Sequence, residues 1–401
     1  MRLNRNVWMA SLIAGLFAFT LNIGMFVVPT FSTAVLGATD SQVGILVAAP
    51  GVLAMLLMVP SAPISNRVGR RRVMILSTIA GVLAAILYLT ARSFQQLLVA
   101  QLVFGASNAF FWPSNLAYSC EVAGPRAISQ AQATNTAAQG VGLVLGPIVA
   151  GILTQRSGYQ GALWAWLVCA LANLGLAVRL TSLPTQPQSG SLGSAIIRSL
   201  QAIPSMCCNT RLLVAMLSQL LTAAFVTSIG GAFFILFVQD VGYSATLASL
   251  FLSLRELFGT ISRALYASIR RYVSNQLILS LVPLIAGSAL LLGFSRPILP
   301  VLLVIIALEG FALGLTAPAG NTEASENASE EDLAETIAVV VVMFQVGTVI
   351  FPPIIGQLMR MMDRTKGLMT GTLLVILLSI CPLVLSLKTR TESAQSQEIE
   401  V

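Results

Sequence analysis

The sequence predicts an all-α membrane protein in which twelve transmembrane helices form two pseudo-symmetric six-helix bundles. Three observations lead to this fold class. Of the 401 residues, 56% are hydrophobic and only 9% are charged, which is far from the composition of soluble domains. Apolar stretches of about 20 residues, the length that crosses a bilayer, recur along the whole chain. Glycines and prolines of the first half also reappear in the second half at a nearly constant spacing.

The apolar stretches leave no room for a soluble domain. The first one is too long for a signal peptide and has no small-residue cleavage site, so we expect it to remain as a helix. The predicted spans are 8–35, 42–65, 73–91, 95–119, 131–154, 160–180, 211–238, 244–267, 276–294, 298–319, 334–358 and 367–387.

The two halves of the chain repeat each other, which predicts an N-terminal bundle over 1–180 and a C-terminal bundle over 211–387. A polar linker over 181–210 joins them on the cytoplasmic side, and its part 196–203 forms either a short interfacial helix or a loose loop. The polar tail 388–401 is predicted to be disordered and cytoplasmic. The repeat is carried by the pairs Gly105 and Gly310, Pro113 and Pro318, Gly142 and Gly347, Pro147 and Pro352, and Gly151 and Gly356.

Positive charge indicates the orientation in the membrane. With the first residue inside, most of the 22 Lys and Arg residues fall in segments on that side. Cytoplasmic segments carry such an excess, so we expect both termini in the cytoplasm of an inner or plasma membrane. The same topology explains the net charge of +7, and nucleic acid is not an expected partner.

Residues that ligate metals or catalyse hydrolysis are scarce. The chain has no His, and its five Cys lack metal-ligand spacing, so we read them as small apolar residues. It also has no Gly-rich phosphate loop that ends in Lys. We therefore expect no metal, no cofactor and no enzymatic activity.

A basic loop separates the second and third predicted spans. It contains Asn66, Arg67, Gly69, Arg70 and Arg71, and because Arg is costly in hydrocarbon the loop is expected at the water boundary. The loop resembles the Gly-x-x-x-Asp-Arg-x-Gly-Arg-Arg pattern of the major facilitator superfamily. It departs from that pattern where Asn66 replaces Asp and where Ala replaces the first Gly.

This resemblance implies a cytoplasmic gate. In the family, the Asp of the pattern helps to latch the two halves by facing the start of the eleventh helix, so Asn66 implies a weaker latch. An acidic residue that ends the fourth helix meets the Arg pair, and here Glu121 occupies that place, facing Arg70 or Arg71. The alternative is that Glu121 is a solvated interfacial acid.

Small residues crowd the fifth span, in the stretch GVGLVLGPIVAG. Gly142, Gly146, Pro147 and Gly151 match a Gly-x-x-x-Gly-Pro-x-x-Gly run that the superfamily associates with antiporters, although Ala150 leaves its final Gly-Gly incomplete. The resemblance implies an exporter. The alternative is close helix packing around a proline kink.

Charged residues in the middle of a span are functional candidates, and Arg255, Glu256 and Glu309 qualify as coupling residues. Neighbours on a helix point about 100° apart, so Arg255 and Glu256 are expected to be poor partners. Glu256 shares a face with Arg263, and Arg255 pairs with Glu309 if the eighth and tenth helices approach. A desolvated carboxylate can take up a proton from one side and release it to the other, and Glu309 is our first choice. The alternative is a buried ion pair that holds the bundle together.

Polar and aromatic residues inside apolar spans predict the wall of a substrate cavity. Each aromatic residue alone fits the core or the lipid face as well, but together they suit a partly apolar organic molecule. The predicted wall consists of Asn22, Phe26, Asn108, Phe111, Trp112, Asn115, Asn135, Gln139, Phe225, Ser228, Phe233 and Gln345.

These features predict a monomeric secondary transporter in the lipid bilayer. We expect it to export a small amphiphilic organic compound, with protons as the coupling ion, by alternating access of two bundles around a site at the midplane. One alternative is uptake or facilitated transport of a polar metabolite or organic anion, with Arg255 as the counter-charge. Another is a non-transporting membrane receptor or lipid-moving protein of the same fold.

Overall fold

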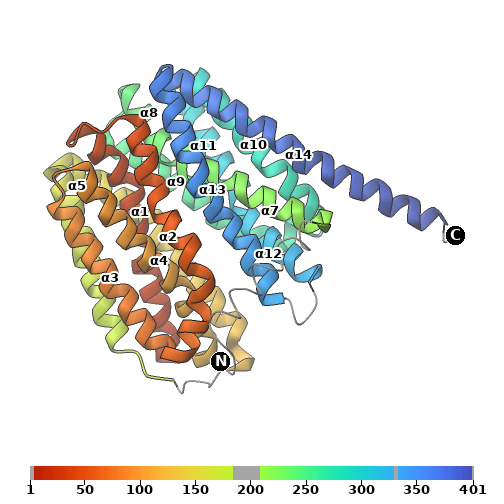
Figure 1. The fold of residues 1–401 in the computed structure, drawn as a ribbon, viewed down its shortest axis with the longest axis horizontal. Helices are drawn as coiled ribbons and strands as arrows, with labels where there is room; N and C mark the ends of the chain where they lie inside the picture. The colour runs from red at the N-terminus through yellow and green to blue at the C-terminus, as the bar shows by residue number, and fades with distance from the viewer. Residues whose placement is uncertain (1–3, 184–207, 329–332, 400–401) are drawn as a thin grey trace.

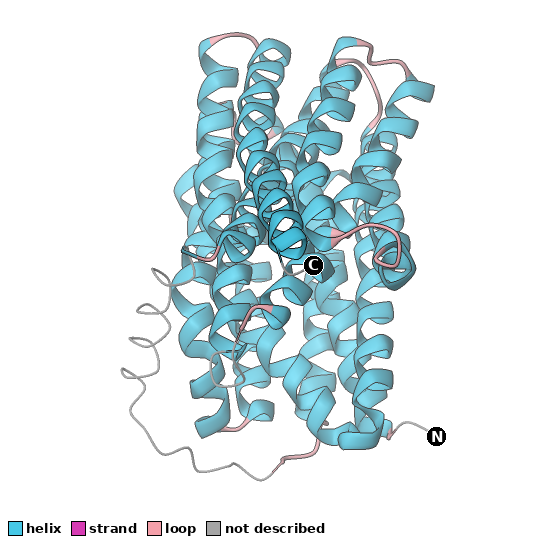
Figure 2. Ribbon diagram, turned by 90° about the vertical axis from the view of Figure 1, so that its right-hand side faces the viewer, coloured by secondary structure: helices cyan, strands magenta, loops and turns pink. Residues whose placement is uncertain are grey.

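Helices make up almost all of the computed structural model, which describes residues 4–183, 208–328 and 333–399. Figure 2 shows only helices and short loops in these ranges. The predicted all-α fold class is therefore confirmed. The linker residues 184–207, including the stretch considered for an interfacial helix, lie outside the described residues.

The N-terminal half begins and ends its helices at residues suited to those positions. Thr39 caps the second helix through a capping box, because its hydroxyl accepts from the backbone of Gln42 while the Gln42 side chain accepts from the backbone of Thr39. Gly69, with φ of 98°, ends that helix and lets the next one start at once. The elements are α1 (Arg5–Ala34), α2 (Asp40–Val68), α3 (Arg70–Thr90), α4 (Phe94–Ala123), the short 3-10 helix η1 (Pro125–Ala127) and α5 (Ile128–Val178).

The C-terminal half contains one irregular span. Its first membrane crossing consists of two α-helices with a π-helix, η2, between them, and Gly231 within η2 departs from helical backbone angles. The elements are α7 (Thr210–Ala223), η2 (Ala224–Ala232), α8 (Phe233–Asp240), α9 (Ala245–Ile269), α10 (Asn275–Ser295), α11 (Leu299–Gly314), α12 (Thr316–Glu326), α13 (Leu333–Met361) and α14 (Arg364–Ile399).

The twelve predicted spans are all helical in the structure, but they do not correspond one to one with its membrane-crossing helices. Among the described residues, 10 helices are long and apolar enough to cross a membrane. One of them, α5, contains two predicted spans, because Gly158 with φ of 69° interrupts it. The second arm runs back along α1, where Tyr159 meets Phe31 and Trp166 approaches Gly24. Another predicted span is α9, which carries Arg255 and is not among the ten.

In Figure 1, α3 and α5 lie on one side of the molecule and α10, α12 and α14 lie on the other. Equivalent residues of the two bundles make equivalent contacts. Gly105 of α4 lies against the backbone of Pro50 in α2, and Gly310 of α11 lies against the backbone of Arg255 in α9. Both residues of the second pair stand 205 positions after those of the first, so the internal repeat seen in the sequence is a repeat of packing.

Two contacts between the bundles follow the same symmetry. Gly151 of α5 lies against the backbone of Ala245 in α9, and Gly356 of α13 lies against the backbone of Asp40 in α2. A Cβ atom at Gly356 would overlap the Asp40 carbonyl, so the two helices approach as closely as helices can. These contacts close the bundles against each other at the end of α2 that is far from Gly69.

An ion pair bridges the bundles at the same end. Arg364, at the start of α14, donates to Asp40 at the start of α2, with Nη2 and Oδ1 2.8 Å apart. It also pairs with Asp240 at the end of α8. Asp40 belongs to the N-terminal bundle and the other two residues belong to the C-terminal bundle, so this cluster, the Arg364 clamp, ties the bundles together.

Ion pairs at the opposite end connect helices of the same bundle. Arg70 pairs with Glu121 in the N-terminal bundle, and Arg270 pairs with Glu326 in the C-terminal bundle. Arg67, at the end of α2, also has a partner. The two ion pairs named here therefore stabilise single bundles.

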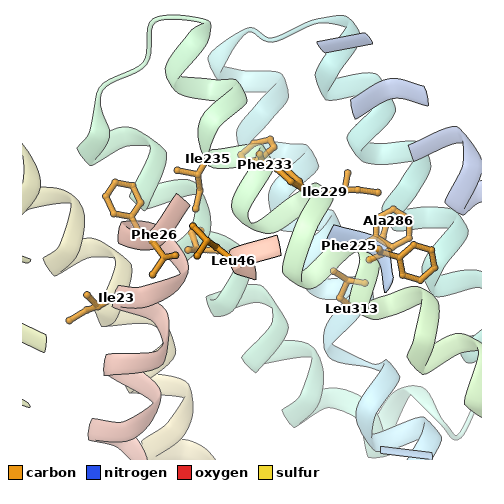
Figure 3. Packing of buried hydrophobic residues seen from close by; sticks show 14 of the residues in the cluster. Ile23, Phe26, Leu46, Phe225, Ile229, Phe233, Ile235, Ala286 and Leu313 are labelled. Atoms are coloured by element: carbon orange, nitrogen blue, oxygen red, sulfur yellow. The ribbon is translucent and has the colours of Figure 1, made fainter. Parts of the chain in front are cut away.

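Buried apolar side chains form one cluster that includes both bundles. Phe26 and Leu46 come from the N-terminal bundle, and Phe233 and Ile235 come from the C-terminal bundle (Figure 3). All four are fully buried. This apolar layer supports the contact between the bundles beneath the Arg364 clamp.

The predicted disorder of the tail 388–401 differs from the structure. Helix α14 continues past the predicted span to Ile399 and projects from the bundle (Figure 1). The segment after Pro382 contains no further Pro and no Gly, and its Ala, Gln and Glu residues favour helix. Polarity alone did not distinguish a solvated helix from a disordered tail.

The Gly356→Val substitution should separate the bundles at the Arg364 end, because the added side chain has no room against the Asp40 backbone. We expect a longer mean distance between spin labels attached at Val35 and Met361, which are exposed at that end. The labels require a background in which the five native Cys are replaced. Gly175→Val is the matched control, because a Cβ there meets nothing within 4 Å. An unchanged distance distribution in Gly356→Val would contradict the proposed close contact.

The Asp40→Asn substitution should weaken the Arg364 clamp while preserving the side-chain shape. Partly exposed ion pairs contribute up to about 1 kcal/mol, so we expect the open population at this end to rise up to about fivefold. The same pair of spin labels, at Val35 and Met361, measures this open population. Asp363→Asn removes a charge from the same end without touching the clamp and should leave the populations unchanged. An equal effect of both substitutions would show that general charge, not the clamp, matters.

Candidate functional site

A cavity of about 350 Å³ lies between the two bundles and is the candidate site. Residues of α1, α2, α4 and α5 form one wall, and residues of η2, α9, α11, α12 and α13 form the other. The first wall is uncharged and the second carries every charge of the lining. Its polar and aromatic lining residues are Asn22, Gln101, Phe104, Asn108 and Trp166 on the first wall and Thr227, Arg255, Glu256, Arg263, Phe344, Gln345 and Thr348 on the second.

Three of the twelve residues predicted for the substrate wall line this cavity, namely Asn22, Asn108 and Gln345. The amide nitrogen of Asn22 donates to the carbonyl of Leu143, at 2.7 Å. The buried Oδ1 of Asn108 has no hydrogen-bond partner among the described residues. The other nine residues lie outside the lining in this conformation: Phe26, Phe111, Trp112, Asn115, Asn135, Gln139, Phe225, Ser228 and Phe233.

The predicted aromatic residues pack in the core. Phe111 stacks on Phe17 with ring centroids 3.8 Å apart, and Trp112 meets the same pair edge-on. These contacts join α4 to α1. Phe26, Phe225 and Phe233 are fully buried members of the apolar cluster.

The predicted amide residues of α4 and α5 bond to one another. Asn135 donates to Oδ1 of Asn115 and to the hydroxyl of Ser119, and Gln139 donates to Oδ1 of Asn135. Asn115 in turn donates to the carbonyl of Ala10 in α1. This network gives hydrogen-bond partners to Asn115, Asn135 and Gln139 and connects three helices of the N-terminal bundle. Ser228, the remaining predicted polar residue, bonds back to its own helix.

Arg255 is held by the irregular span. Its side chain is 3% exposed, and Nη1 donates to the carbonyl oxygens of Val226 and Gly230 in η2, at 3.1 and 2.8 Å. A π-helix exposes carbonyl groups that a regular α-helix would use internally. The π-helix therefore supplies acceptors to a guanidinium that would otherwise be buried without enough partners.

The expectation that Arg255 and Glu256 are poor partners is wrong. Nη2 of Arg255 lies 2.9 Å from Oε1 of Glu256. The two side chains leave the helix in different directions, but both are long, and Arg255 bends towards the carbonyls of η2. The predicted shared face of Glu256 and Arg263 is confirmed by a distance of 3.8 Å between Oε2 and Nη2.

Glu309 stands alone. It is fully buried, and neither carboxylate oxygen has a hydrogen-bond partner among the described residues. From the sequence, Arg255 is expected to pair with Glu309 if their helices approach. Helices α9 and α11 do approach, since Gly310 touches the Arg255 backbone, but this ion pair is not formed. The Glu309 carboxylate instead lies against Gly230, where a Cβ atom would overlap it.

Sequence reasoning missed several lining residues. Arg263 entered only as a neighbour of Glu256, although its position two turns along the same face was the signal that it shares the cavity. Gln101 lines the cavity and accepts from the Tyr88 hydroxyl. Trp166 gave no signal, because one aromatic residue in an apolar span resembles any core residue. Among the described residues, no group of three or more His, Cys, Asp or Glu could hold a metal.

Of the two arginines predicted to meet Glu121, Arg70 and Arg71, the basic loop makes the contact at one. Nε of Arg70 lies 2.5 Å from Oε1 of Glu121, whereas Arg71 donates to the carbonyl of Val178. Asn66 is partly buried at the end of α2 and Arg67 is exposed. The segment just before α13 that Asn66 would face falls in the gap 329–332, so its latch role stays a prediction.

The small residues of α5 face two directions. Gly142 and Gly146 pack on the backbone of α1 inside the N-terminal bundle, and Pro147 is buried beside them. Gly151 instead faces α9 of the other bundle, as does Gly140, which lies against Thr260. Only part of the small-residue run is thus at the interface between the bundles.

Solved structures of other transporters share this architecture. The nucleoside transporter NupG is 13% identical with a TM-score of 0.79, and the alignment covers 96% of this chain and 99% of that chain. A POT family transporter in complex with 5-aminolevulinic acid is 13% identical with a TM-score of 0.77, covering 96% of each chain. A bacterial homologue of the human lysosomal transporter Spinster, in an inward-facing conformation, is 16% identical with a TM-score of 0.75, covering 95% of each chain.

A family comparison agrees with the shared fold. Residues 8–352, and in a second match residues 271–400, fit the family described as the Major Facilitator Superfamily. The matches cover nearly the whole sequence, including both bundles and the cavity between them. The chain therefore belongs to the major facilitator superfamily.

Proposed function

We propose that the chain is a secondary transporter that exports a small amphiphilic organic compound in exchange for protons. One observation carries the proposal: the cavity of about 350 Å³ is bounded by both pseudo-symmetric bundles and contains both polar and aromatic groups. Such a volume suits a small organic molecule. A site between two repeats becomes accessible from either side when the repeats rock against each other.

The closed end of the molecule supports alternating access. Tight glycine contacts and the Arg364 clamp join the bundles at that end. Taken with the charge distribution of the sequence, which assigns the termini to the cytoplasm, the joined end would face outwards.

Glu309 is the proposed proton carrier. A buried carboxylate without hydrogen-bond partners is costly as an anion, so this conformation favours its protonated form. The Arg255–Glu256 pair lies next to it, and Gly230 contacts both Arg255 and Glu309. Movement of η2 during rocking would change the surroundings of Glu309 and allow the proton to leave.

The direction of transport rests on the small-residue run of α5. Gly151 and Gly140 let α5 and α9 approach across the interface, and the superfamily associates this run with antiporters. The compound class rests on the lining and on the transporters of similar fold, whose names mention nucleosides and 5-aminolevulinic acid. We propose a monomer as the working unit, because both walls of the cavity come from one chain.

Glu309→Gln should abolish coupling while leaving the cavity intact, because Gln matches the shape of the protonated acid but cannot exchange a proton. Proteoliposomes that contain a trapped pH dye are screened with lipophilic cations, zwitterions and organic anions. We expect substrate-triggered proton flux in the unaltered protein and a loss of at least about tenfold in the variant. Glu326→Gln, at an exposed carboxylate outside the cavity, should retain the flux.

Undiminished gradient-driven transport in Glu309→Gln would contradict the assignment of Glu309. Movement of a compound without any proton flux in the unaltered protein would contradict proton coupling itself and leave facilitated transport. Failure of every compound class to move would contradict the transport proposal.

Both ends of the chain should be accessible from the cytoplasm only. An epitope tag placed after Val401 in intact cells should bind antibody only after the membrane is permeabilised, because the basic segments favour the inner side. A tag inserted at Gly37, in the loop between α1 and α2, should bind without permeabilisation. The reverse labelling pattern would contradict the proposed orientation.

A further inference from the structure

The charges of the cavity do not balance. Two guanidinium groups, those of Arg255 and Arg263, line it together with one carboxylate, that of Glu256. The opposite wall contributes amides and aromatic rings but no ionisable side chain. Glu309 is fully buried and is not part of the lining. The lining therefore carries an excess positive charge, which would attract an anion.

Arg255 does not provide this excess. Its guanidinium is 3% exposed, and its donors are directed at two carbonyl oxygens of η2 and at Oε1 of Glu256. The closest of these contacts are 2.8 and 2.9 Å long. A substrate anion would have to displace them at the cost of burying unsatisfied carbonyl groups. The earlier alternative, in which Arg255 is the counter-charge, is thus not favoured by the geometry.

Arg263 remains available. Its Nε donates to the carbonyl of Gly259 at 3.0 Å, which fixes the side chain along α9. Its Nη2 lies 3.8 Å from Oε2 of Glu256, longer than a hydrogen bond, and its terminal nitrogens have no other hydrogen-bond partner among the described residues. The side chain is 29% exposed. A guanidinium anchored at Nε with free terminal donors can bind a carboxylate in a forked arrangement.

The wall opposite offers an acceptor. Asn108 lines the cavity, and its Oδ1 has no hydrogen-bond partner among the described residues. That oxygen is buried, so a substrate donor reaches it only after the Asn108 side chain turns towards the cavity. A buried acceptor of this kind gains free energy from any donor that reaches it. The lining also includes the aromatic residues Phe104, Trp166 and Phe344. The site thus combines an anion contact, aromatic surfaces and an acceptor.

We propose that Arg263 is the substrate-anion contact, and that the compound transported is an amphiphilic organic carboxylate with a hydrogen-bond donor for Asn108. This inference rests on the proposed transport function and narrows its substrate class. The anion takes the terminal donors of Arg263, the apolar body packs on aromatic residues of the lining, and the donor group reaches the N-terminal bundle. A molecule that contacts both walls in this way binds both bundles at once.

A charge series with a common body tests the proposal. Hydroxyphenylpropionate, tyramine and tyrosol share a hydroxyphenyl group, which supplies the donor, and are anionic, cationic and neutral respectively. Their Kd values are measured by isothermal titration calorimetry on the purified full chain in detergent, and their uptake is measured in the proteoliposomes. We expect the anion to bind at least about tenfold more tightly than the other two, as a charged hydrogen bond would give.

Arg263→Gln should remove this preference, raising the Kd of hydroxyphenylpropionate about tenfold or more and leaving that of tyrosol unchanged. Arg263→Lys should keep part of the preference, because the charge remains while the fork is lost. Arg270→Gln is the matched control, since Arg270 ends the same helix but lies outside the cavity and should not affect either Kd. Asn108→Ala should weaken the binding of hydroxyphenylpropionate and of tyrosol by the same factor in Kd.

Preference for tyramine, equal binding of the three compounds, or no binding of the anion would overturn the proposal. So would an Arg263→Gln protein that is folded and keeps the anion preference. The preference of the unaltered protein remains a test even if the variant does not fold. Proton flux triggered by tyramine and lost in Glu309→Gln would overturn the anion assignment while leaving the transport proposal intact.

Discussion

The need to satisfy the buried guanidinium of Arg255 shapes the C-terminal bundle. A charge in a membrane span is tolerated only with partners, and here they come from the carbonyls of η2 and from Glu256. The π-helical turn, the glycine at position 230 and the backbone contact at Gly310 all allow α9 to sit close enough for these bonds. Because Arg255 takes Glu256, the carboxylate of Glu309 is left alone beside Gly230. One buried cation thus contacts both the irregular helix and Glu256, while Glu309 has no hydrogen-bond partner among the described residues.

The two bundles differ in the kind of polar side chain that they bury. The N-terminal bundle uses neutral amides, with Asn115, Asn135 and Gln139 bonded in a chain across three helices. This network has no charge to neutralise and can stay rigid as the molecule moves. The C-terminal bundle places its ionisable groups at the cavity, where Arg263 and Glu256 are partly exposed. The division suggests a stable wall on one side and a responsive wall on the other, built on one repeated backbone.

Much of the fold could be predicted because it depends on features that are local in the sequence. Apolar length gave the spans, and the repeat of Gly105 at Gly310 reflects equivalent packing sites. The candidate site was harder to predict because a polar residue in a span looks the same whether it faces a cavity or another amide. Asn22 and Asn135 illustrate this, since only the first lines the cavity. The pairing of Arg255 with Glu256 depends on carbonyls from a distant helix, which no spacing rule contains.

The Arg364 clamp breaks the symmetry of the molecule. Asp40 and Ala245 are equivalent positions, and both touch a glycine of the opposite bundle, but only Asp40 bears a charge. The seam between α2 and α13 is therefore held by backbone contact and by the nearby ion pair between Asp40 and Arg364 of α14, whereas the seam between α5 and α9 is held by contact and by hydrogen bonds from Thr246 to the Gly151 carbonyl and to Gln155. Salt screens the first seam and leaves the second almost unaffected. We expect the bundles to rotate about the neutral seam between α5 and α9, and we expect ionic strength to affect only the ion pair of the Arg364 clamp.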